Sequence, residues 1–201
     1  MSSAPAVAVI GLGRVGLPLA LSFAAAGVRT LGIDNNPAII ASLKAGKMPF
    51  EEAGTQELLD RVRPDFELSD RAADAARARD IVLTIGTPSF SHIESDLSQV
   101  RAVIDDLLPH LHSGHSVILR STIAPGTTEF VAGYIAKRRA EDVYVAHAPE
   151  RIAAGKFLAE IGTLPCIVGG VDEASTDRAA AVFSVFGAPI VRTSPVEAEL
   201  A

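Results

Sequence analysis

Three glycines that follow a short apolar run constrain the fold of this chain more than any other feature. Gly11, Gly13 and Gly16 have the spacing G-x-G-x-x-G and come directly after the apolar segment Val7–Ile10. A continuously apolar run of this length is typical of a parallel strand that is buried on both faces. The residues after the glycines predict a helix over 14–26. The pattern therefore predicts a strand, a tight turn and a helix of an α/β sheet.

Each glycine has its own expected role. Gly11 permits the turn out of the strand, and Gly13 has no Cβ, so that a pyrophosphate can approach the backbone. Gly16 lets the helix pack close to the sheet. The helix N-terminus supplies unpaired N–H groups and a positive dipole potential to phosphates. We assign Arg14 and Val15, at the same turn, to this candidate dinucleotide site.

An acidic residue ends the next apolar run. Asp34 follows a predicted strand over 29–33 and can accept hydrogen bonds from a ribose 2′-hydroxyl. Its charge would repel the 2′-phosphate of NADP, and Asn35 and Asn36 supply no arginine to receive that phosphate. Asp34 and Asn35 are therefore candidate cofactor residues, and the sequence favours NAD. Taken alone, the glycine motif also fits a turn that serves packing only.

Composition limits the remaining classes. The chain has 201 residues, 48% of them hydrophobic, and a formal net charge of −6, which argues against a nucleic-acid-binding protein. The single cysteine, Cys166, excludes an intrachain disulfide framework and suits a reducing cytoplasm. The apolar stretch 6–28 is interrupted by Arg14 and is better explained by a strand and a helix than by a membrane span. We expect a cytoplasmic protein without nucleic-acid or membrane partners.

Polar residues follow three further apolar runs, which predict strands over 80–85, 116–119 and 142–146. The residues of interest after these runs are Gly86, Thr87, Pro88, Ser121, Thr122 and Glu150. Ligands of doubly wound sheets bind at the carboxyl ends of the strands, so the residues should share one crevice with Gly11 and Asp34. We predict an α/β, Rossmann-like, doubly wound and mostly parallel sheet with helices on both faces.

Local composition also predicts the segments between the strands. Asp70 is expected to cap an alanine-rich helix that extends to about residue 78, and residues 89–95 are expected to form a polar loop. A short helix is expected over 51–62.

The histidines do not form a recognisable metal-binding or catalytic motif. His110, His112 and His115 lie where a helix ends and a turn begins, an ordinary solvated position, and no metal site is predicted. His147 lies beside the predicted crevice and is a candidate for a substrate or cofactor contact.

In combination and order, these motifs resemble the N-terminal NAD-binding domain of the nucleotide-sugar 6-dehydrogenases, the family that contains the UDP-glucose and UDP-N-acetylmannosamine dehydrogenases. The resemblance extends from Val7 to the last residue. Its most specific segments are GLGRVGLPLA at 11–20, STIAPGTTE at 121–129, APERI at 148–152 and IVGG at 167–170.

The resemblance implies an enzyme that oxidises a sugar C6 alcohol to a carboxylate in two NAD-dependent steps, with thiohemiacetal and thioester intermediates on a downstream cysteine. Thr87, with its neighbours, would line the NAD site. Thr122 would hold a water or the substrate hydroxyl near the nicotinamide, and Glu150 would act as a base or orienting group for the same water. Arg151 would assist with substrate charge. Cys166 lies in an apolar run and cannot replace the catalytic cysteine.

The same motifs favour the N-acetylhexosamine branch, of ManNAc type. The glucose enzymes usually carry a second glutamate, which would fall at Ala154 here. A UDP-glucose 6-dehydrogenase stays an alternative. A stand-alone dinucleotide-binding module without catalysis and a 3-hydroxyacid or 6-phosphogluconate-type dehydrogenase are further alternatives.

The family continues into a connecting helix with a catalytic lysine and asparagine, a cysteine motif and a UDP-binding domain. We therefore expect residues 1–201 to be a single NAD-binding domain that lacks these parts and is inactive alone. The full-length protein is expected to bind a UDP-sugar and to form a homodimer or a larger assembly.

Overall fold

The computed structural model describes residues 4–63, 66–86, 89–91, 94–95, 97–139 and 142–201. Among these residues, eight strands form one sheet. They are β1 (Val7–Ile10), β2 (Thr30–Ile33), β3 (Glu67–Ser69), β4 (Asp80–Leu83), β7 (Ser116–Leu119), β8 (Tyr144–His147), β9 (Cys166–Gly170) and β10 (Ile190–Thr193). A separate antiparallel pair consists of β5 (Ser89–Ser91) and β6 (Glu94–Ser95).

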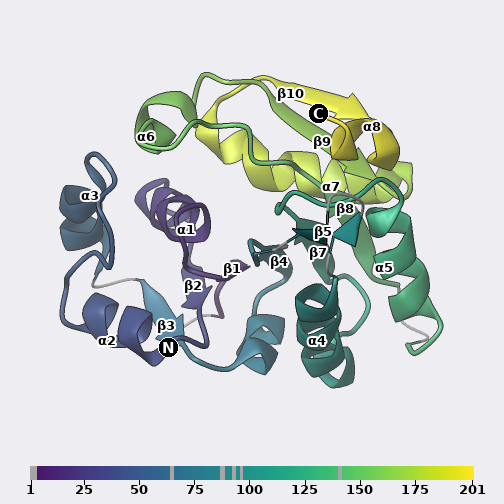
Figure 1. Cartoon of the computed structure of the whole chain (residues 1–201), viewed down its shortest axis with the longest axis horizontal. Coiled ribbons are helices and arrows are strands. Elements are labelled where there is room, and N and C mark those ends of the chain that lie inside the picture. The colour runs from purple at the N-terminus through teal and green to yellow at the C-terminus, as the bar shows by residue number, and fades with distance from the viewer. Residues whose placement is uncertain (1–3, 64–65, 87–88, 92–93, 96, 140–141) are drawn as a thin grey trace.

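The helices lie between the strands along the chain and cover the sheet (Figure 1). The α-helices are α1 (Gly16–Ala25), α2 (Pro37–Lys44), α3 (Thr55–Val62), α4 (Ser98–Leu107), α5 (Thr127–Ala136), α6 (Phe157–Glu160), α7 (Glu173–Phe183) and α8 (Pro195–Glu199). Short 3₁₀ helices are η2 (Ala72–Arg77), η3 (Leu108–His110) and η4 (Ser184–Phe186). None of the helices in the described part of the chain is long and apolar enough to cross a membrane.

The strand order is β10-β9-β8-β7-β4-β1-β2-β3. From β3 to β8 every neighbouring pair is parallel, and this part has the order of a doubly wound dinucleotide-binding sheet. β9 pairs antiparallel with β8, and β10 pairs parallel with β9, so the last two strands run in the opposite direction. The predicted mostly parallel α/β fold is confirmed.

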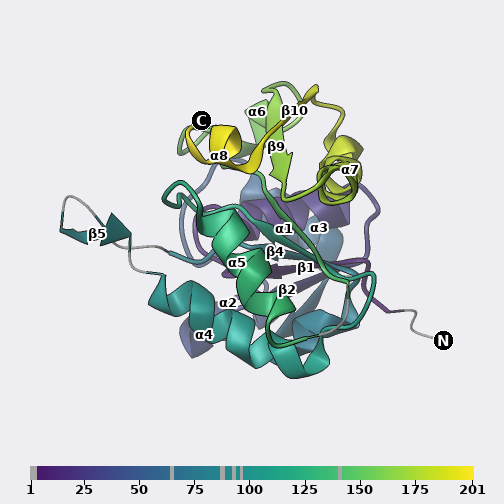
Figure 2. The same ribbon diagram turned by 90° about the vertical axis from the view of Figure 1, so that its right-hand side faces the viewer.

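Two hydrophobic cores lie on the two faces of this sheet. Successive strand residues point to opposite faces, so Val7 and Val9 pack in one core while Ala8 and Ile10 pack in the other. The first core includes residues of α1, α2, α3 and α7, and the second includes residues of η2, α4 and α5 (Figures 1 and 2). Burial on both faces explains why the strands are continuously apolar.

Three local predictions were wrong. The segment after Asp70 forms the 3₁₀ helix η2, and Asp70 does not cap it, because Ser69 Oγ accepts the N–H of Arg71 and donates to Asp74. The expected polar loop contains β5 and β6, whose backbone pairing needs no apolar pattern. The helix expected over 51–62 begins only at Thr55, because Gly54 takes a left-handed conformation with φ 75°.

Candidate functional site

The carboxyl ends of the parallel strands bring the predicted site residues to one edge of the sheet. Gly11 follows β1 and Asp34 follows β2, while Gly86 lies beyond β4. Ser121 and Thr122 follow β7, and Glu150 follows β8; Ser121 Oγ donates to the carbonyl oxygen of Ile85 beyond β4. The predicted residues Thr87 and Pro88 lie outside the described residues.

A cavity of about 950 Å³ opens at one part of this edge. Of the predicted cofactor residues, Gly11, Asp34 and Asn35 line it, together with residues after β3 and along α4. Thr122 and Glu150 do not belong to its described lining and lie further along the edge. The cavity is therefore on the side of the edge where the adenosine half of a dinucleotide would bind.

The glycine turn has the geometry of a phosphate cradle. Gly11 has φ 95°, and a Cβ there would lie 2.8 Å from the carbonyl oxygen of Thr84. A Cβ at Gly16 would overlap the carbonyl oxygen of Gly11, so only glycine lets α1 start this close to β1. A Cβ at Gly13, in contrast, would have no heavy atom within 4 Å. The protein thus leaves no room for a side chain at Gly11 and Gly16, whereas the backbone of Gly13 faces open space.

The N-terminus of α1 adds to this cradle. Val15 is its N-cap residue and makes no side-chain capping hydrogen bond. In its first turn the N–H of Leu17 donates to the carbonyl oxygen of Gly13 and Pro18 has no N–H, so this end would offer a phosphate the N–H groups of the glycine turn and the positive end of the helix dipole. The residues present therefore fit a dinucleotide pyrophosphate.

Asp34 braces the same turn. Its Oδ2 accepts a hydrogen bond from the backbone N–H of Leu12 at 2.7 Å, and its Oδ1 accepts one from Asn36 at 2.8 Å. Each carboxylate oxygen has two lone pairs, so both retain capacity for a ribose hydroxyl. Asp34 thus lines the cavity and also ties the end of β2 to the glycine turn.

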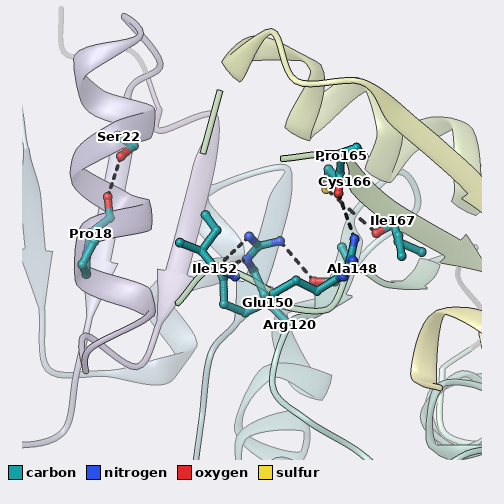
Figure 3. Close-up of polar contacts among 10 residues, drawn as sticks. Pro18, Ser22, Arg120, Ala148, Glu150, Ile152, Pro165, Cys166 and Ile167 are labelled. Carbon is teal, nitrogen blue, oxygen red and sulfur yellow. Dashed lines mark hydrogen bonds and ion pairs between the residues drawn. The ribbon is translucent and has the colours of Figure 1, made fainter. Parts of the chain in front are cut away.

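A buried ion pair that the sequence analysis missed lies at the ends of β7 and β8 (Figure 3). Arg120 donates to Glu150 Oε2 from Nη2 at 2.7 Å and from Nε at 3.1 Å. The two side chains are 5% and 10% exposed. Arg120 Nη1 also donates to the carbonyl oxygen of Ala148, and Ile152 N–H donates to Glu150 Oε1 at 2.8 Å. The sequence signal for this pair was an arginine at the end of an apolar strand, because a guanidinium that is buried there needs a charged partner.

This ion pair determines how Glu150 is oriented. Both of its carboxylate oxygens have a protein partner, and the guanidinium of Arg120 also lies 4.8 Å from the ring centre of Phe183. Arg151, the other candidate substrate residue, is exposed and donates to the carbonyl oxygen of Pro165. Glu150 is therefore a fixed carboxylate, whereas Arg151 lies at the surface.

Cys166 is half-buried at the start of β9, close to Arg120 and Glu150 (Figure 3). Burial raises the pKa of its thiol, and the nearby guanidinium of Arg120 opposes that rise only in part. A thiol with a raised pKa is a poor nucleophile at neutral pH. This environment supports the expectation that Cys166 is not the catalytic cysteine.

Of the three histidines expected at solvated positions, His110 and His112 are exposed, whereas His115 is buried. His115 is only 4% exposed, and its Nδ1 lies 2.9 Å from Nδ1 of His112 and accepts the backbone N–H of that residue. Burial lowers the pKa of His115, and the nearby His112 lowers it further. In the described part of the chain, no group of three or more His, Cys, Asp or Glu side chains could hold a metal ion.

His147 is also buried, with 1% exposure at the end of β8. Its Nδ1 is 2.9 Å from the carbonyl oxygen of Leu119, to which it donates a hydrogen bond. Burial lowers the pKa of His147 to about 4, so the side chain is neutral at pH 7. The ring thus joins β8 to β7 from inside the protein.

Comparison with known proteins decides the family. Residues 5–187 match the sequence model of the UDP-glucose/GDP-mannose dehydrogenase family, NAD binding domain. The chain belongs to this family. The match confirms the predicted nucleotide-sugar dehydrogenase family and its cofactor, NAD.

Individual relatives in this family are about twice as long as the chain. The UDP-N-acetyl-D-mannosamine dehydrogenase of Methanococcus maripaludis is 31% identical over 184 residues, which are 90% of this chain and 42% of that protein. The structure of a UDP-D-ManNAc dehydrogenase from Pyrococcus horikoshii is 32% identical, with a TM-score of 0.90, and the match covers 96% of this chain and 48% of that one. A UDP-glucose dehydrogenase from Pyrobaculum islandicum is 31% identical, with a TM-score of 0.89, over 99% of this chain and 48% of that one. The chain therefore spans less than half the length of these relatives.

Proposed function

We propose that this NAD-binding domain serves a UDP-N-acetylhexosamine 6-dehydrogenase of ManNAc type, which oxidises the sugar C6 alcohol to a uronic acid in two steps. The observation that carries the NAD site of this proposal is the open backbone at Gly13, which lies between two glycines where the protein leaves no room for a side chain. The cavity at Asp34 lies beside this turn. When bound, NAD would supply the oxidant for each step by accepting a hydride.

The remaining cofactor contacts extend along the carboxyl edge of the sheet. The proposed set is Gly11, Gly13, Arg14, Val15, Gly16, Asp34, Asn35, Gly86, Thr87, Pro88, Ser121 and Thr122. The backbone at the start of α1 would hold the pyrophosphate, and Asp34 would hold the adenosine ribose. The loop after β7 would then lie beside the nicotinamide.

Thr122 and Glu150 are the proposed catalytic residues. The hydroxyl of Thr122 would hold a water or the substrate hydroxyl, and Glu150 would orient or accept a proton from the same water. Arg120 supports this role, because its two hydrogen bonds fix the direction of the Glu150 carboxylate. Arg151, at the surface beside this pair, would contact the charge of the substrate.

Other parts of the enzyme must supply the nucleophile and the UDP site. We propose that residues 1–201 are one NAD-binding domain and that the connecting helix, the catalytic cysteine and the UDP-binding domain lie outside them. The half-buried thiol of Cys166 supports this division. The whole enzyme is proposed to be cytoplasmic and at least a homodimer.

UDP-glucose oxidation is the second candidate. The P. horikoshii and P. islandicum structures, which differ in their sugar, match this domain with nearly equal identity and TM-score. The preference for the N-acetylhexosamine branch therefore rests on the motifs at 121–129 and 148–152 rather than on the shape of the domain.

Two glycines offer a matched test of the proposed cofactor site. At both Gly13 and Gly133, a Cβ would have no heavy atom within 4 Å, so alanine fits the protein at either position. Only Gly13 lies in the cradle, whereas Gly133 lies within α5. We expect Gly13→Ala to weaken NAD binding about tenfold or more, because its methyl group would meet the pyrophosphate. Gly133→Ala should leave NAD affinity unchanged.

Isothermal calorimetry with NAD measures both variants, and thermal unfolding checks that each is folded. Equal NAD affinity in wild type and Gly13→Ala would contradict the proposed position of the pyrophosphate. An equal loss in both variants would point to a general effect of alanine on stability.

A further inference from the structure

The last helix of the chain packs onto the same edge of the sheet as the candidate site. α8 follows β10 and lies beside α5 in both views (Figures 1 and 2), and Ala198 on α8 is fully buried. Its approach depends on Gly169 of β9, because a Cβ there would overlap the carbonyl oxygen of Ser194, the N-cap residue of α8. The backbone at the start of α8 therefore rests directly on the sheet.

The other end of α8 supplies the cap that α5 lacks. The N-cap residue of α5 is Gly126, which has φ 88° and no side chain to bind the first N–H groups of the helix. Glu199 binds them instead. Its Oε2 accepts the N–H of Gly126 at 2.6 Å, and its Oε1 accepts the N–H and the hydroxyl of the fully buried Thr128 at 2.7 and 2.6 Å. A carboxylate at this position also interacts favourably with the helix dipole.

The start of α5 is the far end of the loop that carries Thr122. The near end of this loop is held at Ser121, whose hydroxyl donates to the carbonyl oxygen of Ile85. The far end is held at Gly126 by Glu199. Thr122 thus lies between two residues of the loop that are held by hydrogen bonds, Ser121 and Gly126. The acceptor for Gly126 is Glu199, which lies 73 positions further along the chain.

We propose that Glu199 is a positioning residue for Thr122, so that docking of α8 sets the loop beside the nicotinamide of bound NAD. The inference rests on the proposed function, in which that loop contacts the nicotinamide. Without the carboxylate, the first turn of α5 would lose an acceptor for each of two backbone N–H groups, and residues 121–126 would gain freedom.

The test compares Glu199→Gln with Glu197→Gln in the 201-residue chain. Both remove one negative charge from α8, but in the described part of the chain the side chain of Glu197 accepts hydrogen bonds from Thr193 and Ser194 alone, directly before its own helix. Glutamine also serves in a capping box, so Glu197→Gln should preserve α8. Calorimetry with NAD and with ADP-ribose, which lacks the nicotinamide, separates an effect on the loop from a general effect on the adenosine site.

We expect Glu199→Gln to weaken NAD binding about fivefold and to leave ADP-ribose binding unchanged, since a bond to a charged acceptor is replaced by weaker ones. Glu197→Gln should change neither affinity. Hydrogen exchange should also become faster at the amides of Gly126 and Thr128 in Glu199→Gln, while exchange in β1 and β4 stays at the wild-type rate.

Unchanged NAD affinity in Glu199→Gln, or an equal loss of NAD and ADP-ribose affinity, would overturn the inference. Unchanged exchange at Gly126 and Thr128 would overturn it as well, whether or not NAD binds. A wild-type chain that binds neither ligand would instead reject the proposed function, so the two failures are distinguishable.

Discussion

At Gly11, Gly13 and Gly16 the same residue type meets three different surroundings. Two of the three positions exclude a side chain because the backbone or side chain of Thr84 and the turn itself lie too close. The third faces open space. The spacing of the motif predicted a tight turn, and the distances at Gly11 and Gly16 give the reason, whereas the contact between Gly13 and a pyrophosphate stays a prediction.

Asp34 has a structural role and a proposed binding role, and the two can be measured separately in one variant. We expect Asp34→Ala to weaken NAD binding about tenfold and to narrow the preference for NAD over NADP, because the charge opposing a 2′-phosphate is lost. The loss of its bonds to Leu12 and Asn36 should also lower the free energy of unfolding by about 1–2 kcal/mol.

Calorimetry with NAD and NADP and urea unfolding measure these effects. Asp70→Ala, which removes another carboxylate from the lining of the same cavity, is the control. Equal NAD affinity in wild type and Asp34→Ala would contradict the placement of the ribose.

His147 should make the stability of the domain depend on pH. Its folded pKa of about 4 lies below the value of 6.5 for an unperturbed histidine, so the unfolded chain binds the proton more tightly. The stabilisation is therefore complete above pH 6.5 and is lost as the pH falls toward 4. Between pH 7.5 and pH 5 we expect a loss of about 2 kcal/mol from this residue.

His147→Asn keeps a donor for the carbonyl oxygen of Leu119 but does not titrate. Urea unfolding at the two pH values should show a smaller loss in this variant than in wild type. His115, whose pKa is also lowered by burial, contributes in the same direction and stays in both proteins. An identical pH dependence would show that His147 is not the group responsible.

Among the strands and helices, two arginine–carboxylate pairs, one buried and one partly buried, join elements at opposite ends of the parallel strands. Arg120 and Glu150 link the carboxyl ends of β7 and β8. Arg178 of α7 binds Asp80 at the start of β4 through two hydrogen bonds of 2.6 Å. A buried pair is costly to break, because the remaining charge has no partner. Both pairs therefore hold elements in register, but only the first lies at the candidate site.

Removing one member of the pair at the site should destabilise the domain. We expect Arg120→Met to lower the free energy of unfolding by about 3 kcal/mol, because Glu150 would keep a buried charge and, among the described residues, would retain the N–H of Ile152 as its one hydrogen-bond donor. The double variant Arg120→Met/Glu150→Leu should recover most of this loss.

Urea unfolding measures each variant, with Arg178→Met as the matched control. Asp80 retains the hydroxyl of Ser116 as a donor, so the loss in Arg178→Met should be smaller than in Arg120→Met. A double variant that is as unstable as Arg120→Met would show that packing around the guanidinium, rather than the pair, is what matters.

For the whole molecule, the proposal that the catalytic cysteine and the UDP site lie outside residues 1–201 predicts NAD binding without oxidation of a UDP-sugar. The chain should bind NAD and should not oxidise UDP-N-acetylmannosamine or UDP-glucose, because the nucleophile and the UDP site are proposed to lie elsewhere. Calorimetry with NAD and absorbance of NADH at saturating UDP-sugar test the two halves of this prediction. Complete C6 oxidation by residues 1–201 alone would contradict it.

The sequence predicted elements best where a local rule decides them. The bounds of β1 and β7 agree with the sequence patterns, since apolar runs mark buried strands. The prediction failed at η2, a 3₁₀ helix without a side-chain cap, and at the β5–β6 pair, which has no apolar signal. The first failure depends on side-chain hydrogen bonds of Ser69 and the second on backbone pairing, and composition encodes neither.

The candidate site shows the same division. The sequence by itself determined the glycine turn, Asp34 and the order of polar residues at the strand ends, because each follows from spacing along one chain. Only the tertiary structure decided that Arg120 binds Glu150, that His115 and His147 are buried, and that Glu199 caps α5. These contacts join segments that are far apart in sequence, and their partners are set by the parallel register of the sheet and by the return of α8 to its carboxyl edge.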